Sequence, residues 1–393
     1  MKKKFGGLIV VTGVLALSIA ACQMTGQRKA SGPAVPSWSE SMRGLGESVR
    51  ELVPFIYIRD GFADQAHHKK VRNAIQRLAK EAEEMHPELG EAYLGKDPIL
   101  SLAVGRMNSD LERALDAFET GLYEYSRSTM KSVMNTCFAC HTATERGGAV
   151  GWKWEDVKIA GLRPLERADL MVAMRDFDGA ASYLRHLLND PQFIQTRPFD
   201  FETALRKYLA LMVRVKKQPD EALNEINKVL EREGVPFFLQ QQAEGWRRSL
   251  ERWSREIARG PSRVPPLTQA EERLRQARQI QRYARDHAGD VEYLRATQIL
   301  HDFVTSRPSA SNLAQAFYAL GQAYEALDNV GFWNLHETYY EACVRTLPKS
   351  DVARSCFNRL QASIFMGYSG SGGIMVPASE RQRLQELSEL IHQ

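Results

Sequence analysis

Two cysteines and a histidine lie within five residues of one another, in the string Cys137-Phe138-Ala139-Cys140-His141. Thiols separated by two residues can add across the two vinyl groups of a haem and form two thioether bonds. The histidine that follows is then held under the porphyrin, where its ring can ligate the iron. The spacing therefore predicts one covalent haem c, with Cys137 and Cys140 as its attachment sites and His141 as its proximal ligand.

A CxxC pair also occurs in redox-active dithiols and in zinc sites. A thioredoxin-type pair opens a helix that follows a strand, and no strand pattern precedes Cys137. A zinc site needs a second pair of ligands, and the sequence offers none at a suitable spacing. We also find no Ser/His/Asp or Cys/His triad and no second metal motif, so we expect no enzymatic reaction.

The N-terminus has the pattern of an export signal. Three lysines follow the first methionine, and residues 8–21 form an apolar stretch that is short for a membrane span. This stretch ends in Ile19-Ala20-Ala21-Cys22, which resembles the lipobox of bacterial lipoproteins. The resemblance implies that residues 1–22 form a lipoprotein signal, that Cys22 is diacylated, and that the lipid anchors the chain to a membrane. An ordinary signal peptide with a cysteine nearby is the alternative.

The same resemblance implies a location. In such lipoproteins an aspartate after the lipidated cysteine tends to retain the protein at the inner membrane, whereas Gln23 stands here, which favours the outer membrane. Covalent haem attachment occurs outside the cytoplasm, in agreement with a periplasmic protein. The formal charge is +4, and removal of residues 1–21, with three lysines and no acid, leaves +1. Nothing in this balance indicates nucleic acid as a partner.

Two further cysteines, Cys343 and Cys356, flank the segment 346–350, which has the composition of a turn between two helices. Antiparallel helices on either side of the turn can bring the two thiols face to face, and an oxidising periplasm permits the bond. We therefore expect a disulfide between Cys343 and Cys356. The alternative is a pair of buried thiols, because sequence does not fix the Cα separation.

Apolar residues recur every three or four positions from Trp38 onward, which predicts an all-α fold. Before this point, residues 23–37 are polar and contain glycine, serine and proline, as is typical of a flexible tether. The apolar stripes within residues 38–148 predict four helices. These are expected at about 38–56, 71–85, 98–122 and 126–141. The 44% of apolar residues is enough for two or more cores in a chain of this length.

Four helices of this length, with the Cys137–His141 string near the end of the fourth, resemble the class II cytochromes c, the cytochrome c-prime family. The resemblance covers residues 38–148 and implies an up-down-up-down four-helix bundle with haem near its open end. The Cys137–His141 string is the specific motif on which the resemblance depends. The remaining similarity lies in the order and spacing of the helices. The family usually has an aromatic residue and an arginine three and four residues after the histidine, where this chain has Thr144 and Glu145.

The sixth ligand of the iron is expected where the first and fourth helices meet. In an up-down bundle the start of the first helix and the end of the fourth lie at the same end. Met42 lies in the first turns of the first helix and is the expected metal ligand, and core packing is its alternative role. Met85 and His86 lie at the same end and are weaker candidates.

A class I cytochrome is a less favoured alternative. It would place the motif near the start of a domain and take its second ligand, Met171 or Met174, from downstream. Residues 165–190 have the pattern of a different structure, and residues 38–130 would then have no role. We therefore favour the class II arrangement over this one.

The rest of the chain shows weak self-similarity near 34 residues, which predicts helical repeats at 149–259 and 267–393 with a linker at 260–266. The clearest unit resembles a tetratricopeptide repeat and carries Phe317, Leu320, Gly321, Tyr324, Ala342 and Pro348. A glycine-dense loop at 367–373 then precedes a last helix at 378–392. A helical hairpin array is the expected architecture, with an irregular all-α domain as the alternative.

Two classes of function fit these features. The first is a one-electron carrier whose haem cycles between two oxidation states and whose repeats dock it to a protein redox partner at the membrane. The second is a gas-binding sensor of the cytochrome c-prime type, if the sixth position of the iron is open. A partner-binding assembly lipoprotein with a structural haem is a third possibility.

Overall fold

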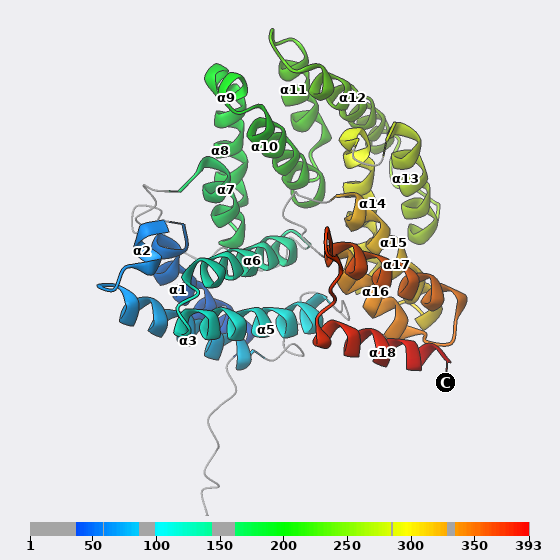
Figure 1. Ribbon diagram of the computed structural model, residues 1–393. Helices are drawn as coiled ribbons and strands as arrows, with labels where there is room; N and C mark the ends of the chain where they lie inside the picture. The colour runs from blue at the N-terminus through cyan, green and yellow to red at the C-terminus, as the bar shows by residue number, and fades with distance from the viewer. Residues whose placement is uncertain are drawn as a thin grey trace, which may run out of the picture. The chain divides into compact units, whose positions relative to one another are not determined.

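Figure 1 shows the computed structural model, which describes residues 37–57, 59–85, 99–143, 162–283, 286–327 and 335–392. Residues from Ser37 to Gln393 form one compact unit. The described residues are all-α, as the sequence predicted, apart from one pair of two-residue strands. None of the helices among them is both long and apolar enough to cross a membrane.

The N-terminal helix group consists of the helices drawn from blue to teal in Figure 1. Its members are α1 (Trp38–Tyr57), α2 (Arg59–Ala63), α3 (His68–Glu83), α5 (Ile99–Glu119) and α6 (Tyr123–His141). The apolar stripes expected from the sequence meet in a shared core, which we call the first core. It includes Leu52, Ile56, Ile75, Leu111 and Met130, each with no exposed surface.

Contacts at the helix ends show that consecutive long helices of this group run in opposite directions. The ring of Phe55 near the end of α1 lies 5.3 Å from that of His67 at the start of α3, and Arg72 at the start of α3 contacts Glu119 at the end of α5 at 2.7 Å. The buried Ser126 hydroxyl near the start of α6 donates to a carbonyl near the end of α5 at 2.6 Å. The start of α1 and the end of α6 therefore lie at the same end of the group.

The third long helix ends earlier than its apolar stripe suggested. Gly121 takes a φ of 83°, and the amide of Leu122 donates to the carbonyl of Ala117 at 2.8 Å. This pattern closes a helix, because glycine adopts the left-handed conformation without steric cost. Leu122, expected on the buried stripe, therefore lies beyond the helix end and is 60% exposed.

The C-terminal helix group is drawn from green to red in Figure 1. Its first half contains α7 (Pro164–Ala173), α8 (Phe177–Asn189), α9 (Pro191–Thr196), α10 (Pro198–Ala210), the π-helix η2 (Leu211–Val215), α11 (Pro219–Leu230) and α12 (Phe237–Ala258). Its second half contains α13 (Pro266–Ile280), the 3₁₀ turn η3 (His287–Gly289), α14 (Asp290–Thr305), α15 (Ala310–Ala326), α16 (Leu335–Thr346), α17 (Asp351–Gly367), β1 (Ser369–Gly370), β2 (Gly373–Ile374) and α18 (Ala378–His392). A second core runs continuously through this group, from Ala168 to Ile391.

The expected linker at 260–266 is a short loop between α12 and α13, and contacts cross it. The indole of Trp246 in α12 donates to the carbonyl of His287 at 2.7 Å. Arg206 in α10 and Asp290 in α14 form a buried ion pair at 2.7 Å. Apolar residues from both sides of the loop also belong to one cluster, so the two sides share the same packed core.

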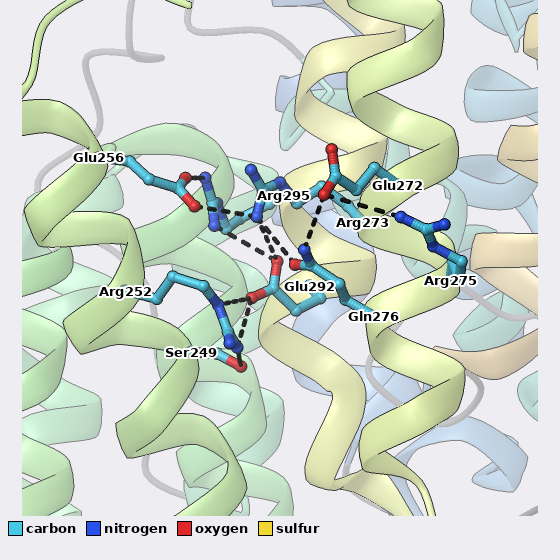
Figure 2. A network of polar contacts seen from close by, with 9 residues as sticks. All are labelled: Ser249, Arg252, Glu256, Glu272, Arg273, Arg275, Gln276, Glu292 and Arg295. Carbon is cyan, nitrogen blue, oxygen red and sulfur yellow. Dashed lines mark hydrogen bonds and ion pairs between the residues drawn. The ribbon is translucent and has the colours of Figure 1, made fainter.

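A network of charged side chains also joins α12 to α13 and α14 (Figure 2). Glu292 in α14 has no exposed surface and contacts Arg252 of α12 at 3.2 Å and Arg295 at 3.3 Å. Arg273 of α13 lies 3.1 Å from Glu256, which also accepts from Arg295 at 2.5 Å. Buried and half-buried charges of both signs thus pair with one another across three helices.

The end of the chain follows the sequence-based expectation closely. Cys343 in α16 and Cys356 in α17 are joined in a disulfide, with their Cα atoms 6.3 Å apart, and the turn between the helices lies at 347–350. The last helix, α18, has the expected bounds. The glycine-dense loop before it contains the antiparallel pair β1 and β2.

Candidate haem-attachment site

The three predicted haem residues occupy the last two turns of α6. This helix contains neither glycine nor proline between Tyr123 and His141. Cys137, Cys140 and His141 are related by steps of three and four residues, which brings side chains to one face of an α-helix. The sequence spacing therefore becomes a single cluster of two thiols and one imidazole. The structure brings these three predicted site residues together.

The two thiols lie at the boundary between the two cores. The side chain of Cys137 is half-buried and packs against the first core, whereas that of Cys140 packs against the second. Among the described cysteines, Cys343 and Cys356 form a disulfide, whereas Cys137 and Cys140 are not part of one. The two cysteines of the motif thus pack against different cores.

Helix α7 closes this boundary and contributes to both cores. Leu170, Ala173 and Met174 belong to the first core, and Ala168 and Met171 to the second. Lys131 of α6 contacts the buried Glu166 of α7 at 3.0 Å. A helix from the region in which the sequence predicts repeats therefore packs against α6.

The imidazole of His141 is in an environment that favours its neutral form. Burial lowers its pKa to about 4, and the positive charge of Arg175 acts in the same direction, against the carbonyl groups of Ala173 and Val172. Its Nδ1 atom is buried and has no hydrogen-bond partner within the described part of the chain. A neutral imidazole with an available nitrogen is the form that ligates iron.

The thiol of Cys137 differs from that of a redox-active dithiol. Burial raises its pKa to about 11. Its Sγ atom lies 3.7 Å from the carbonyl oxygen of Val133, one turn earlier in α6. Redox CxxC pairs have a thiol with a lowered pKa, because the thiolate is the nucleophile. The environment of Cys137 therefore disfavours the dithiol alternative.

A buried polar chain leads from the end of α6 into the C-terminal helix group. Arg214 on η2 is 4% exposed and donates to the hydroxyl of Thr142 at 3.0 Å and to the phenol of Tyr324 at 2.7 Å. That phenol is also 2.7 Å from the Nε2 atom of His301. Thr142 directly follows His141, so the chain reaches the expected iron ligand.

Met42 lies where the sequence analysis expected it. It is half-buried, lies on α1 and packs against the first core, at the end of the N-terminal helix group that also holds His141. Met85 is buried in the same core, and His86 lies outside the described residues. Cys22 also lies outside them.

Met174, the ligand that a class I arrangement could use, belongs to the core against which Met42 packs. It follows α7 immediately and is 5% exposed. Helix α7 lies almost entirely in the stretch 165–190, which has the pattern of a different structure, and it packs directly against α6. Met174 is therefore a second candidate for the sixth position.

The donor set fits a haem better than it fits a metal held by protein ligands alone. Among the residues that the structure describes, no group of three or more His, Cys, Asp or Glu side chains is arranged to hold a metal ion. A haem iron takes four ligands from the porphyrin and needs only axial ligands from the protein. The imidazole of His141 and the methionines of the first core could supply axial ligands, and the two thiols could supply the attachment.

Sequence reasoning missed the arginines that approach this site. Arg175 and Arg214 are distant in sequence from the residues that they contact, by 34 and 72 positions. Neither arginine stands in a motif, so no local pattern indicated it. Comparison with protein-family models, with curated proteins and with solved structures finds no match to this chain.

Proposed function

We propose that this protein is a monohaem c-type cytochrome that transfers single electrons in the periplasm. One observation carries the proposal: Cys137, Cys140 and His141 form a single cluster on α6, at the boundary between two cores. The raised pKa of the Cys137 thiol and the lowered pKa of His141 support haem attachment over a redox dithiol. In this interpretation α1, α3, α5 and α6 are a four-helix bundle, and α7 to α18 a tetratricopeptide-like array.

The residues of the chain would act as follows. Cys137 and Cys140 hold haem c through thioether bonds, and the neutral imidazole of His141 supplies the proximal ligand. A bound haem supplies an iron that changes oxidation state by one electron. Met42 is the proposed sixth ligand of the iron, and Met174 is the alternative. Helix α7 packs against α6 and contributes side chains to both of the cores beside these residues.

The helical array is the proposed docking element for a protein redox partner. Arrays of helical hairpins form extended surfaces that bind other proteins. Cys22 would anchor the protein to a membrane by its lipid, with the outer membrane favoured by Gln23. Membrane fractionation of wild type and a Cys22→Ala variant tests this point: loss of membrane association in the variant supports lipidation, and unchanged association argues against it.

Absorption spectroscopy of the exported protein without residues 1–22 tests the haem proposal. A low-spin spectrum that carbon monoxide does not change indicates a six-coordinate electron carrier. A high-spin spectrum that shifts with carbon monoxide indicates an open site and supports the gas-binding alternative instead. Protein without covalent haem contradicts both.

A matched pair of variants makes this test specific. Replacing both Cys137 and Cys140 by alanine should abolish the haem mass on the denatured chain. Replacing both Cys343 and Cys356 by alanine, which removes the same number of sulfur atoms, should leave it in place. The fully haem-loaded protein could still bind its partner and yet exchange no electrons with small redox mediators. In that case the haem is structural and the protein is a partner-binding assembly lipoprotein.

A further inference from the structure

Two irregular backbone segments of the C-terminal helix group carry arginines to the end of α6. Arg175 follows the C-cap of α7 and has a φ of 60°. Arg214 lies on the five-residue π-helix η2. Both conformations are uncommon, and they recur where a structure must direct a side chain to a particular place. Arg175 contacts His141, the last residue of the proposed haem motif, and Arg214 contacts Thr142, the residue that follows it.

The left-handed position of Arg175 is one at which glycine is usual. The amide of Arg175 donates to the carbonyl of Val172 and that of Asp176 to the carbonyl of Met171, each at 2.9 Å, which closes α7. A helix closed in this way takes glycine at the left-handed residue, because a Cβ atom is disfavoured there. The side chain of Arg175 instead packs over the ring of Phe177 and donates to the carbonyl oxygen of His141 at 3.4 Å.

Arg214 reaches the same place from a different element. Its guanidinium donates to Thr142 and Tyr324, and it lies 5.5 Å from the centre of the Tyr324 ring. Tyr324 is stacked on Tyr339, with ring centres 5.5 Å apart, and bonds to His301. Arg214 therefore ties Thr142 to a rigid group of buried rings in α14, α15 and α16.

We propose that Arg175 and Arg214 are positioning residues, which hold the backbone of His141 and the side chain of Thr142 and so fix the orientation of the axial imidazole. The proposal rests on the proposed haem function. It makes the ligand geometry of the iron depend on the C-terminal helix group, although both attachment cysteines belong to α6. Movement of that group on partner binding would then reach the haem through two arginines.

Arg175→Gly is the sharpest test, because it removes the guanidinium while suiting the backbone. Glycine is favoured at positive φ, so thermal stability should be unchanged or slightly raised. We expect the electron paramagnetic resonance signal of the ferric haem to shift or broaden, because the imidazole adopts more than one orientation. Arg307→Gly is the matched control, since Arg307 has a φ of 57° but an exposed side chain after α14. Its signal should equal that of wild type.

Arg214→Met tests the second contact. It keeps the length of the side chain and removes its donors, and we expect a shift of the same signal and a changed ratio of high-spin to low-spin haem. Arg214→Lys retains a donor and should restore part of the wild-type signal. Arg206→Met serves as the control for loss of a buried arginine, because Arg206 bonds to Asp290 rather than to the haem motif.

The covalent haem on each purified chain is measured first, by mass. Absence of haem from wild type overturns the proposed function itself. Full haem loading with wild-type spectra in both Arg175→Gly and Arg214→Met overturns only the positioning role. Spectral changes in these two variants, with none in Arg307→Gly and Arg206→Met, support it.

Discussion

The guanidinium of Arg127 in α6 donates to the carbonyl oxygen of Ile56 in α1 at 3.2 Å. The start of α6 therefore lies beside the end of α1, and the two helices run in opposite directions. Met42 precedes Ile56 by 14 residues, and His141 follows Arg127 by the same number. At a rise of about 1.5 Å per residue, both lie about 21 Å from that contact, at the same end of the helix group.

Replacing Met42 by leucine tests whether it ligates the iron. Leucine fills a similar volume but cannot donate a sulfur, so we expect low-spin haem to become high-spin and to bind carbon monoxide. Met130→Leu, in the same core, should leave the absorption spectrum unchanged. A Met42→Leu spectrum equal to that of wild type, with a change in Met174→Leu, would assign the sixth position to Met174.

Removing the disulfide should destabilise the end of the C-terminal helix group. The bond closes a loop between residues 13 apart, and loss of such a restraint on the unfolded chain costs about 3 kcal/mol. We expect this fall in the free energy of unfolding when Cys343 and Cys356 are both replaced by alanine, measured with denaturant. Reductant should destabilise wild type and leave the double variant unaffected. Equal transitions for both proteins under oxidising conditions would refute the expectation.

Among the residues of the network in Figure 2, substitution of Glu292 should cause the largest loss of stability, since its carboxylate is buried against guanidinium groups. Glu292→Ala leaves those charges without their shared carboxylate, which costs about 3–5 kcal/mol in a buried site. Urea denaturation measures the loss. Glu272→Ala is the control at the exposed edge of the same network, where an ion pair contributes about 0–1 kcal/mol. Similar losses in the two variants would show that burial does not set the effect.

Stability should fall in acid, partly through Glu341, which bonds to Arg345 within α16 and to Arg383 in α18. Burial alone raises the pKa of Glu341, but the charges of Arg383 and Arg345 outweigh it, and the net pKa is lowered. Folding therefore favours the ionised form. This contribution is present above the unfolded pKa of about 4.3 and is lost as the pH falls through the lowered folded value.

A Glu341→Gln variant checks this sign. The difference in the free energy of unfolding between wild type and Glu341→Gln should be largest near pH 7 and should shrink towards pH 3. Glu386→Gln, on the exposed face of α18, should show little difference at either pH. A constant difference across the range would mean that the ionised form of Glu341 is not the source of the stability.

Local patterns predicted most of the helices and the thiols of the candidate site. The stripe that starts at Trp38 and the turn at 347–350 were placed correctly because both depend on residues close in sequence. Helix α5 ended early because a local glycine conformation at Gly121 overrode the apolar spacing. The packing of Met174 in the first core was not predicted, because it depends on how α7 meets α6.

The sequence by itself determined the candidate chemistry. Cys137, Cys140 and His141 are close along the chain, so helical periodicity alone brings them to one face. Only the tertiary structure decided what surrounds them, because Arg175 and Arg214 come from elements far along the chain. Contacts of that kind depend on how packed cores and irregular segments direct side chains, and no spacing rule records them.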